Sequence, residues 1–145
     1  MIIQDAYPVI VTDQLTACRD FYQHWFGFEV GFEASWFIWL YSETDSANHQ
    51  PYSLGFMHSS HPSNPPGPER FLGQGMFLTL QVEDAAAEYE RLRQAGLKIE
   101  YELHDEPWGQ RRFMVKDPAG TLVDVVQQTE PAPDFWLPYM SAAQS

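Results

Sequence analysis

Two histidines three residues apart, His58 and His61, come closest in this sequence to a metal-site pattern. Imidazoles at this spacing can share a metal ion when they stand on one turn of a helix. Here they fall between the end of an expected strand and a proline-rich loop, and no acidic or cysteine residue lies near them in the sequence. The spacing therefore makes His58 only a weak candidate metal ligand.

Motifs for nucleophilic or phosphate chemistry are missing from the sequence. It contains no Gly-x-Ser-x-Gly, no glycine-rich phosphate loop and no recognisable Cys/His pairing. The single cysteine, Cys18, falls on the apolar face of an expected helix, which predicts a buried small hydrophobic side chain. One cysteine forms no intramolecular disulfide, and no leader peptide or membrane-spanning apolar run is visible, so we expect a cytoplasmic protein.

The charge of the chain favours a cationic guest. Twenty acidic residues against eight basic ones give a formal net charge of −12, and the acidity is spread over both halves. Such a field repels the phosphates of nucleic acids and anionic lipid headgroups and attracts cations. We therefore expect neither a nucleic acid nor a membrane as a partner.

The length and composition predict one folded domain, residues 1–145. The chain is 44% hydrophobic and 15% aromatic but only 19% charged, a composition that excludes intrinsic disorder. A chain of this size can bury a sizeable core.

The order of the expected elements repeats. A strand, a helix and three strands are predicted at 7–12, 16–26, 28–32, 36–41 and 52–58, and again at 77–82, 84–95, 97–103, 111–116 and 121–127. Residues 59–75 are rich in proline and glycine and form a connector. The fold class is therefore α+β, with tandem βαβββ modules at 6–58 and 76–128, each forming a curved half-barrel sheet.

Matching residues mark the repeat as well. Asp13 precedes the first helix and Asp84 the second, and each is placed to cap its helix or to sit in the first turn. A glycine follows each helix, at Gly27 and Gly96, as expected for a helix C-terminus. The sequence Asp117-Pro118-Ala119-Gly120 predicts a tight turn that joins the last two strands as a hairpin.

This duplicated module resembles the vicinal oxygen chelate superfamily, which contains glyoxalase I, extradiol dioxygenases and the bleomycin resistance proteins. The resemblance covers residues 6–128 and is most specific in the segment from Glu106 to Gly120. The Pro107-Trp108-Gly109 sequence before the penultimate strand is most similar to the bleomycin resistance proteins. The resemblance implies a glyoxalase/bleomycin resistance-like fold and a homodimer.

The same resemblance implies a ligand site. Bleomycin resistance proteins hold a planar heteroaromatic group between two aromatic side chains in crevices at the dimer interface, and the matching residues here are Phe32 and Trp108. Carboxylates lie near both in the sequence, among them Asp105 and Glu106, and aromatic rings fringed by carboxylates suit a cation. Trp36, on an aromatic strand, is a further candidate for the same surface. Alternation along the strand places Trp36 and Ile38 on one face and Phe37 and Trp39 on the other, but it does not say which face lines the ligand site.

Superfamily enzymes hold a divalent cation with His, Gln or Glu side chains from the first and last strands of each half. The matching positions here fall near Ala6 and Phe77, among residues 53–55, and at Asp124, so one plausible ligand remains of four. We therefore expect no metal and no cofactor, with Asp124 and His58 as the weak candidates. The alternative is a metal-dependent glyoxalase-like lyase or isomerase, or an extradiol dioxygenase.

The expected function is thus a metal-free protein that sequesters a cationic aromatic compound, as an antibiotic resistance protein would. Residues 129–145 form a tail that includes Phe135, Trp136, Leu137 and Tyr139, which is too apolar to stay in solvent. We expect the tail to pack on a neighbouring surface, such as that of a partner subunit.

Overall fold

The computed structural model describes residues 1–43 and 51–140, and the chain divides into two compact units. The first comprises Met1–Gln74 with Asp117–Gly120, and the second Gly75–Lys116 with Thr121–Ser145. Most of the expected connector and the Asp-Pro-x-Gly turn therefore belong to the first unit. Among the described residues, no helix is long and apolar enough to cross a membrane.

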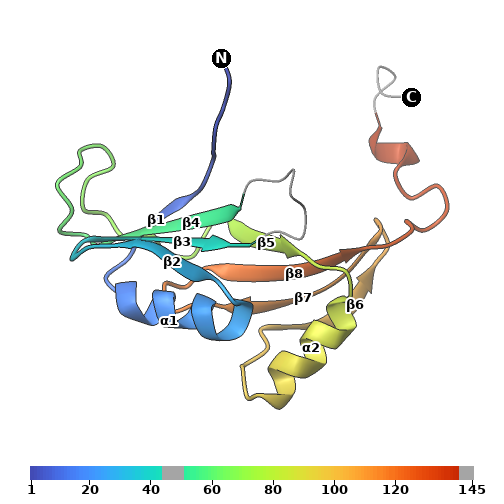
Figure 1. The fold of residues 1–145 in the computed structure, drawn as a ribbon. Coiled ribbons are helices and arrows are strands. Elements are labelled where there is room, and N and C mark those ends of the chain that lie inside the picture. The colour runs from blue at the N-terminus through green and yellow to red at the C-terminus, as the bar shows by residue number, and fades with distance from the viewer. Residues whose placement is uncertain (44–50, 141–145) are drawn as a thin grey trace. The chain divides into compact units, whose positions relative to one another are not determined.

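Each unit contains one four-stranded sheet and one helix, coloured from blue to green in the first unit and from yellow-green to orange in the second (Figure 1). The first unit contains β1 (Val9–Val11), α1 (Leu15–Phe26), β2 (Glu29–Glu33), β3 (Phe37–Ser42) and β4 (Tyr52–Met57). The second contains β5 (Phe77–Gln81), α2 (Ala85–Gln94), β6 (Tyr101–Glu106), β7 (Gln110–Lys116) and β8 (Leu122–Gln128), and then a 3-10 turn, η1 (Leu137–Tyr139). The predicted α+β fold with two βαβββ modules is confirmed.

The two sheets have the same topology. Their strand orders are β1-β4-β3-β2 and β5-β8-β7-β6, and in each the first strand pairs in parallel with the last while the other pairs are antiparallel. Helix α1 packs on β3 and β4, and α2 packs on β6, β7 and β8. Each helix therefore covers one face of its own sheet.

The core of each unit lies between the helix and the sheet. In the first unit it is built from Ile10, Cys18, Tyr22, Ile38, Leu40, Leu54 and Phe56, and in the second from Leu92, Phe113, Val115, Val123 and Val125. Cys18 has no exposed surface, and burial raises the pKa of its thiol to about 12. The expectation that Cys18 is a packing residue is confirmed.

The second strand of the second sheet begins later than expected. The sequence predicts a strand at 97–103, but β6 starts at Tyr101 and continues to Glu106. The reason is the end of α2, where Gly96 adopts a left-handed φ of 93° and the Leu97 amide donates to the Leu92 carbonyl. Because this amide closes the helix, it is not available to the sheet. The later register places both Asp105 and Glu106 on the strand.

Only one of the two aspartates caps its helix. The Asp84 carboxylate accepts a hydrogen bond from the Ala87 amide at 3.1 Å, as predicted. The prediction for Asp13 is wrong, because α1 begins after Gln14 without a side-chain cap. The Asp13 carboxylate accepts hydrogen bonds from the Ser59 hydroxyl at 2.6 Å and from Arg70 Nε at 2.6 Å. These partners come from distant parts of the chain, so the local sequence does not reveal them.

The Asp117–Gly120 turn joins β7 to β8 as predicted, with a Gly120 φ of 90° and a Gly120 amide that donates to the Asp117 carbonyl. Asp117 is also buried, and its carboxylate accepts a hydrogen bond of 2.7 Å from the Tyr22 hydroxyl of α1. Burial, together with the nearby Asp117 charge, raises the pKa of Tyr22 well above its usual value, so the hydroxyl stays protonated and donates.

The Tyr22 hydroxyl should therefore contribute measurably to stability. Tyr22→Phe is expected to lower the free energy of unfolding by about 2 kcal/mol, because a buried carboxylate loses a hydrogen-bond donor. Urea unfolding at pH 7 measures this change. Tyr52→Phe, at a side chain that is 60% exposed, is the control and should cost far less. Equal losses in the two variants would contradict the role of this hydrogen bond.

The Asp13 contacts predict a dependence of stability on pH. Hydrogen bonds from Arg70 and Ser59 hold the pKa of Asp13 well below its ordinary value. A lowered pKa means that the ionised carboxylate stabilises the fold above about pH 4 and loses that effect as the pH falls further. Asp13→Asn should thus be less stable than the wild type at pH 7, with a gap that narrows below pH 4.

Urea unfolding at pH 7, 5, 4 and 3 tests this expectation. Asp20→Asn is the matched control, because Asp20 pairs on the surface with its neighbour Arg19 at 2.9 Å. A gap for Asp13→Asn that stays constant down to pH 3 would show that the carboxylate acts through something other than its charge.

Candidate ligand-binding site

The first sheet carries a row of aromatic side chains on the face opposite α1. Along β3, the buried Ile38 and Leu40 alternate with half-buried Phe37, Trp39 and Tyr41, so the rings of these three point away from the helix. We call Phe37, Trp39 and Tyr41 the aromatic row. The Trp39 and Tyr41 rings stack with centroids 5.6 Å apart and an interplanar angle of 27°.

Two glycines make room for these rings. A Cβ atom on Gly31 of β2 would come within 2.1 Å of the Trp39 ring, and one on Gly55 of β4 would come within 3.2 Å of the Phe37 ring. Residues larger than glycine would therefore displace the aromatic row. The Trp39 ring therefore occupies the space that a side chain at position 31 would fill.

Phe32 and Trp36 stand at the Phe37 end of the aromatic row. Their ring centroids lie 6.5 Å and 6.0 Å from that of Phe37. Phe32 is 56% exposed and Trp36 is 37% exposed, so both have surface available to a ligand. The expected grouping of Trp36 with Ile38 is wrong: β3 begins after Trp36, whose ring contacts Phe37, whereas Ile38 is buried under α1.

The second sheet carries an arginine between two aromatic rings on the face opposite α2. The Arg112 guanidinium carbon lies 5.2 Å from the centroid of Trp108 and 5.5 Å from that of Tyr101. We call Tyr101, Glu106, Trp108, Arg112 and Asp124 the Arg112 cluster.

Two buried carboxylates complete this cluster. Glu106 accepts hydrogen bonds from the Tyr101 hydroxyl at 2.8 Å and from Arg112 Nη2 at 3.4 Å. Asp124 accepts one from the Thr79 hydroxyl at 3.0 Å, and its other oxygen lies 3.9 Å from Arg112 Nη1. Glu106 is thus not the exposed rim carboxylate that the sequence suggests, because its side chain is only 6% exposed.

The environment of Asp124 disfavours its charge. Its Oδ1 atom is buried without a hydrogen-bond partner. Burial raises the pKa of Asp124, and the Thr79 hydrogen bond and the Arg112 charge only partly oppose this effect. An additional positive charge near the Arg112 cluster would favour the ionised form.

Asp105 lies on the other side of the second sheet from Glu106. Its carboxylate pairs with Arg111 Nε at 2.6 Å, and this contact lowers the pKa of Asp105. Arg111 alternates along β7 with Arg112 and shares its side with Phe113, whose ring contacts Tyr89 of α2. The structure therefore does not bring Asp105 together with Trp108.

The weak metal candidates are held by other groups. His58 Nε2 lies 3.3 Å from the Asp13 carboxylate, and His61 Nε2 lies 2.6 Å from the Gly67 carbonyl oxygen. Asp124 has the Arg112 guanidinium beside it. Within residues 1–43 and 51–140, no group of three or more His, Cys, Asp or Glu side chains is arranged to hold a metal ion.

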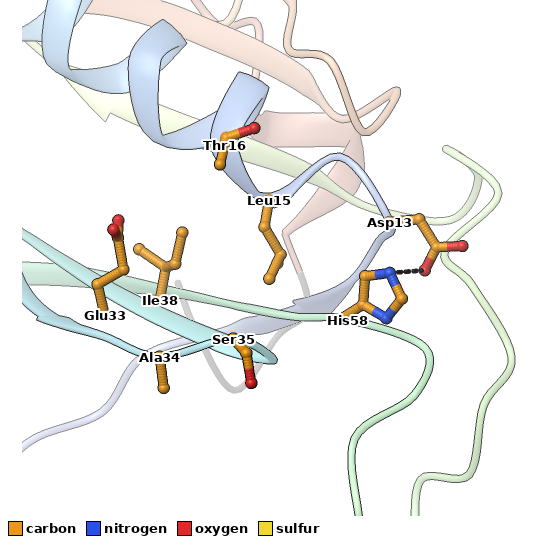
Figure 2. A pocket seen from close by; sticks show the side chains of 8 residues that line it. All are labelled: Asp13, Leu15, Thr16, Glu33, Ala34, Ser35, Ile38 and His58. Atoms are coloured by element: carbon orange, nitrogen blue, oxygen red, sulfur yellow. Dashed lines mark ion pairs between the residues drawn. The ribbon is translucent and has the colours of Figure 1, made fainter.

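A pocket of about 240 Å³ in the first unit was not foreseen from the sequence (Figure 2). Leu15 and Ile38 form its apolar wall, and the ion pair of Asp13 with His58 closes one end. Glu33 also lines it, but its carboxylate is paired with Arg19 at 3.0 Å. Its charged groups therefore already have partners, and among the described residues no phenylalanine, tyrosine or tryptophan side chain lines it.

Phe32 belongs to the first unit and Trp108 to the second. The pairing of these two residues around one guest, in a crevice between subunits, stays a prediction.

The chain resembles known proteins in sequence and in fold. The sequence pattern of the Glyoxalase/Bleomycin resistance protein/Dioxygenase superfamily matches residues 6–125. No curated protein matches the sequence.

Several solved structures share the fold at low sequence identity. A glyoxalase/bleomycin resistance protein/dioxygenase from Nocardioides is 18% identical, with a TM-score of 0.70 and coverage of 92% of this chain and 90% of that one. Lactoylglutathione lyase from Agrobacterium tumefaciens is 21% identical, with a TM-score of 0.65 and coverage of 85% and 92%. A bleomycin resistance determinant encoded on the transposon Tn5 is 19% identical, with a TM-score of 0.58 and coverage of 87% and 98%.

The structural matches establish the fold alone, whereas the sequence pattern spans most of the chain, from the start of the first module to the last strand of the second. The protein therefore belongs to the glyoxalase/bleomycin resistance protein/dioxygenase superfamily.

Proposed function

We propose that this protein binds a planar, cationic aromatic small molecule on the helix-free faces of its sheets, without a metal ion. The observation that carries this proposal is the composition of those faces. One presents the aromatic row with Phe32 and Trp36 at its end, and the other presents Trp108 beside the Arg112 guanidinium, which lies against two buried carboxylates. Stacking on such rings contributes about 0.5–1.5 kcal/mol per contact beyond the area buried.

The charge distribution of the first unit supports a cationic guest. Its sequence holds two basic residues, Arg19 and Arg70, and both form ion pairs elsewhere, with Glu33 and with Asp13. By contrast, a carboxylate stands at the aromatic row, because the Tyr41 hydroxyl donates to Glu29 at 2.7 Å. A cation stacked on the row would gain about 0.5–2 kcal/mol from the ring quadrupoles.

The charges of the second unit also favour a cationic guest. The Arg112 cluster sets two carboxylates, Glu106 and Asp124, against the single guanidinium of Arg112. Because burial disfavours the charge of Asp124, a cationic guest beside the cluster would favour its ionised form. The net charge of −12 adds a long-range attraction for cations. We propose that these carboxylates act through their field, since both are already buried in the cluster.

The alternative is a metal-dependent lyase, isomerase or dioxygenase, and the likeness to the Agrobacterium tumefaciens lactoylglutathione lyase is compatible with it. The positions that match the metal ligands of the superfamily, all within the described part of the chain, do not fit a divalent cation. Asp124, the best-placed carboxylate, already has a guanidinium 3.9 Å away, and the Phe77 side chain offers no ligand atom.

Sequestration of a toxic compound is the role that fits such a binding protein, by analogy with the Tn5 bleomycin resistance determinant. We propose in addition that two chains pair, as the resemblance implies, and that Phe32 takes part in binding. The lone, buried Cys18 fits a reducing compartment, and the cytoplasm is the proposed location.

Trp108 gives the sharpest test of the binding role. Acridine orange, a planar cationic dye, should quench the tryptophan fluorescence saturably. Trp108→Ala should raise the dissociation constant about tenfold, because the dye loses one stacking and cation–π contact. Raising the salt concentration should weaken binding of both proteins.

Trp25→Ala is the control, because Trp25 lies on α1 rather than on a helix-free face. It removes one fluorophore and should leave the dissociation constant unchanged. If Trp108→Ala binds the dye as tightly as the Trp25 variant, Trp108 is not part of the site.

The metal alternative has its own test. Protein purified without chelators should contain far less than one equivalent of Zn, Ni, Fe or Mn by elemental analysis. Dye binding should also be unchanged after treatment with EDTA. A stoichiometric metal that is lost together with dye binding would overturn the proposed function.

A further inference from the structure

The C-terminal segment, residues 129–140, is tied to the turn that carries Trp108. Three consecutive carbonyls of this turn accept hydrogen bonds from the segment. Pro107 accepts from the Ala132 amide at 2.8 Å, Trp108 from the Trp136 indole at 3.1 Å, and Gly109 from the Thr129 amide at 2.8 Å. The segment therefore packs against this turn within the second unit.

Backbone geometry on both sides maintains this contact. Gly109 has a φ of 109°, and a Cβ atom there would come within 2.9 Å of the Thr129 carbonyl oxygen. Asp134 has a φ of 60° and is the one residue other than glycine with a positive φ in the described part of the chain. Such a conformation persists where the surrounding contacts fix it. It immediately precedes Phe135, the residue that reaches Trp108.

Phe135 makes an aromatic contact with Trp108. Its ring centroid lies 6.3 Å from that of Trp108 at an interplanar angle of 47°, within the range of favourable aromatic pairs. A slot for a planar guest would instead need two parallel rings, with the guest between them. The two rings therefore touch rather than form a slot, and Phe135 occupies the neighbourhood of the indole.

We propose that Phe135 is a cover of Trp108 that a bound ligand displaces, so that this residue sets the affinity of the site. The inference rests on the proposed binding function and extends it to the C-terminal segment. It assigns the segment a role on its own chain, in addition to any contact with a partner subunit.

Phe135 is easier to displace than Arg112, which also lies beside the Trp108 ring. Arg112 lies against Glu106 and Asp124, and moving it would leave two buried carboxylates without a counter-charge. Phe135 carries no charge, and its ring otherwise packs on Trp136 and Tyr139, which are 46% and 70% exposed. It also lines a hollow of about 300 Å³ formed by residues 131–137, so its ring is not enclosed on every side.

The experiment compares the wild type with Phe135→Ala and with the matched control Leu137→Ala. Leu137 lies two residues further along the same segment and is 63% exposed. Hydroxyl-radical footprinting with mass spectrometry measures the oxidation of Trp108 without any ligand. A parallel titration measures the dissociation constant for acridine orange.

Phe135→Ala should raise the oxidation of Trp108 and tighten acridine orange binding about three- to tenfold, the range expected from losing one competing aromatic contact. Leu137→Ala should change neither quantity. Unchanged Trp108 oxidation in Phe135→Ala would overturn the proposal that Phe135 covers Trp108. Raised oxidation with weaker dye binding would show that Phe135 is instead a wall that contacts the guest, and would also overturn the proposal.

Failure of the underlying function gives a different result. If the dye binds neither the wild type nor Phe135→Ala while Trp108 oxidation still rises in the variant, the proposed binding function fails. The proposal that a ligand displaces Phe135 then fails as well, although the raised oxidation still shows that Phe135 shields Trp108.

Discussion

Each helix in this protein covers only one face of its sheet, and the rest of the structure follows from that constraint. The covered faces bury aliphatic and aromatic residues and hold the fold together. The other faces are free to carry side chains that do not serve the core, and here they carry rings, carboxylates and one arginine. Strand alternation enforces the division, since neighbouring residues point to opposite faces. Phe37 and Ile38 therefore have different tasks although they are adjacent.

Arg112 determines the chemistry of the second unit. A guanidinium between two rings and beside two carboxylates supplies a fixed positive charge where a metalloenzyme would need an exchangeable cation. Asp124 still has a buried oxygen without a hydrogen bond, so the cluster is not fully satisfied. The same arrangement disfavours metal chemistry, and the Trp108 ring lies between the Arg112 guanidinium and the displaceable Phe135 ring.

The sequence predicted what depends on local pattern and repetition. The two modules, the Asp117–Gly120 turn, the Asp84 cap and the buried Cys18 all follow from spacing along the chain. The sequence-based prediction failed where the partner is distant in the sequence. The Asp13 carboxylate bonds to Ser59 and Arg70 instead of capping the helix. The sequence-based prediction also failed where the limits of a strand decide. β6 starts four residues later than predicted and includes both Asp105 and Glu106, which as neighbours on a strand point to opposite faces. For the contacts of residues 129–140 with Trp108, the apolar composition of the segment was the one signal in the sequence, and it did not indicate the contact partner.

The central claim is that the helix-free faces are the binding surfaces and need no metal. A crystal structure of EDTA-treated protein with acridine orange tests it most directly. The account predicts that the dye ring stacks on Trp108 or on the aromatic row, with no metal ion between dye and protein. Dye found only in the pocket beside α1, or held through a metal ion coordinated by protein side chains, would contradict it.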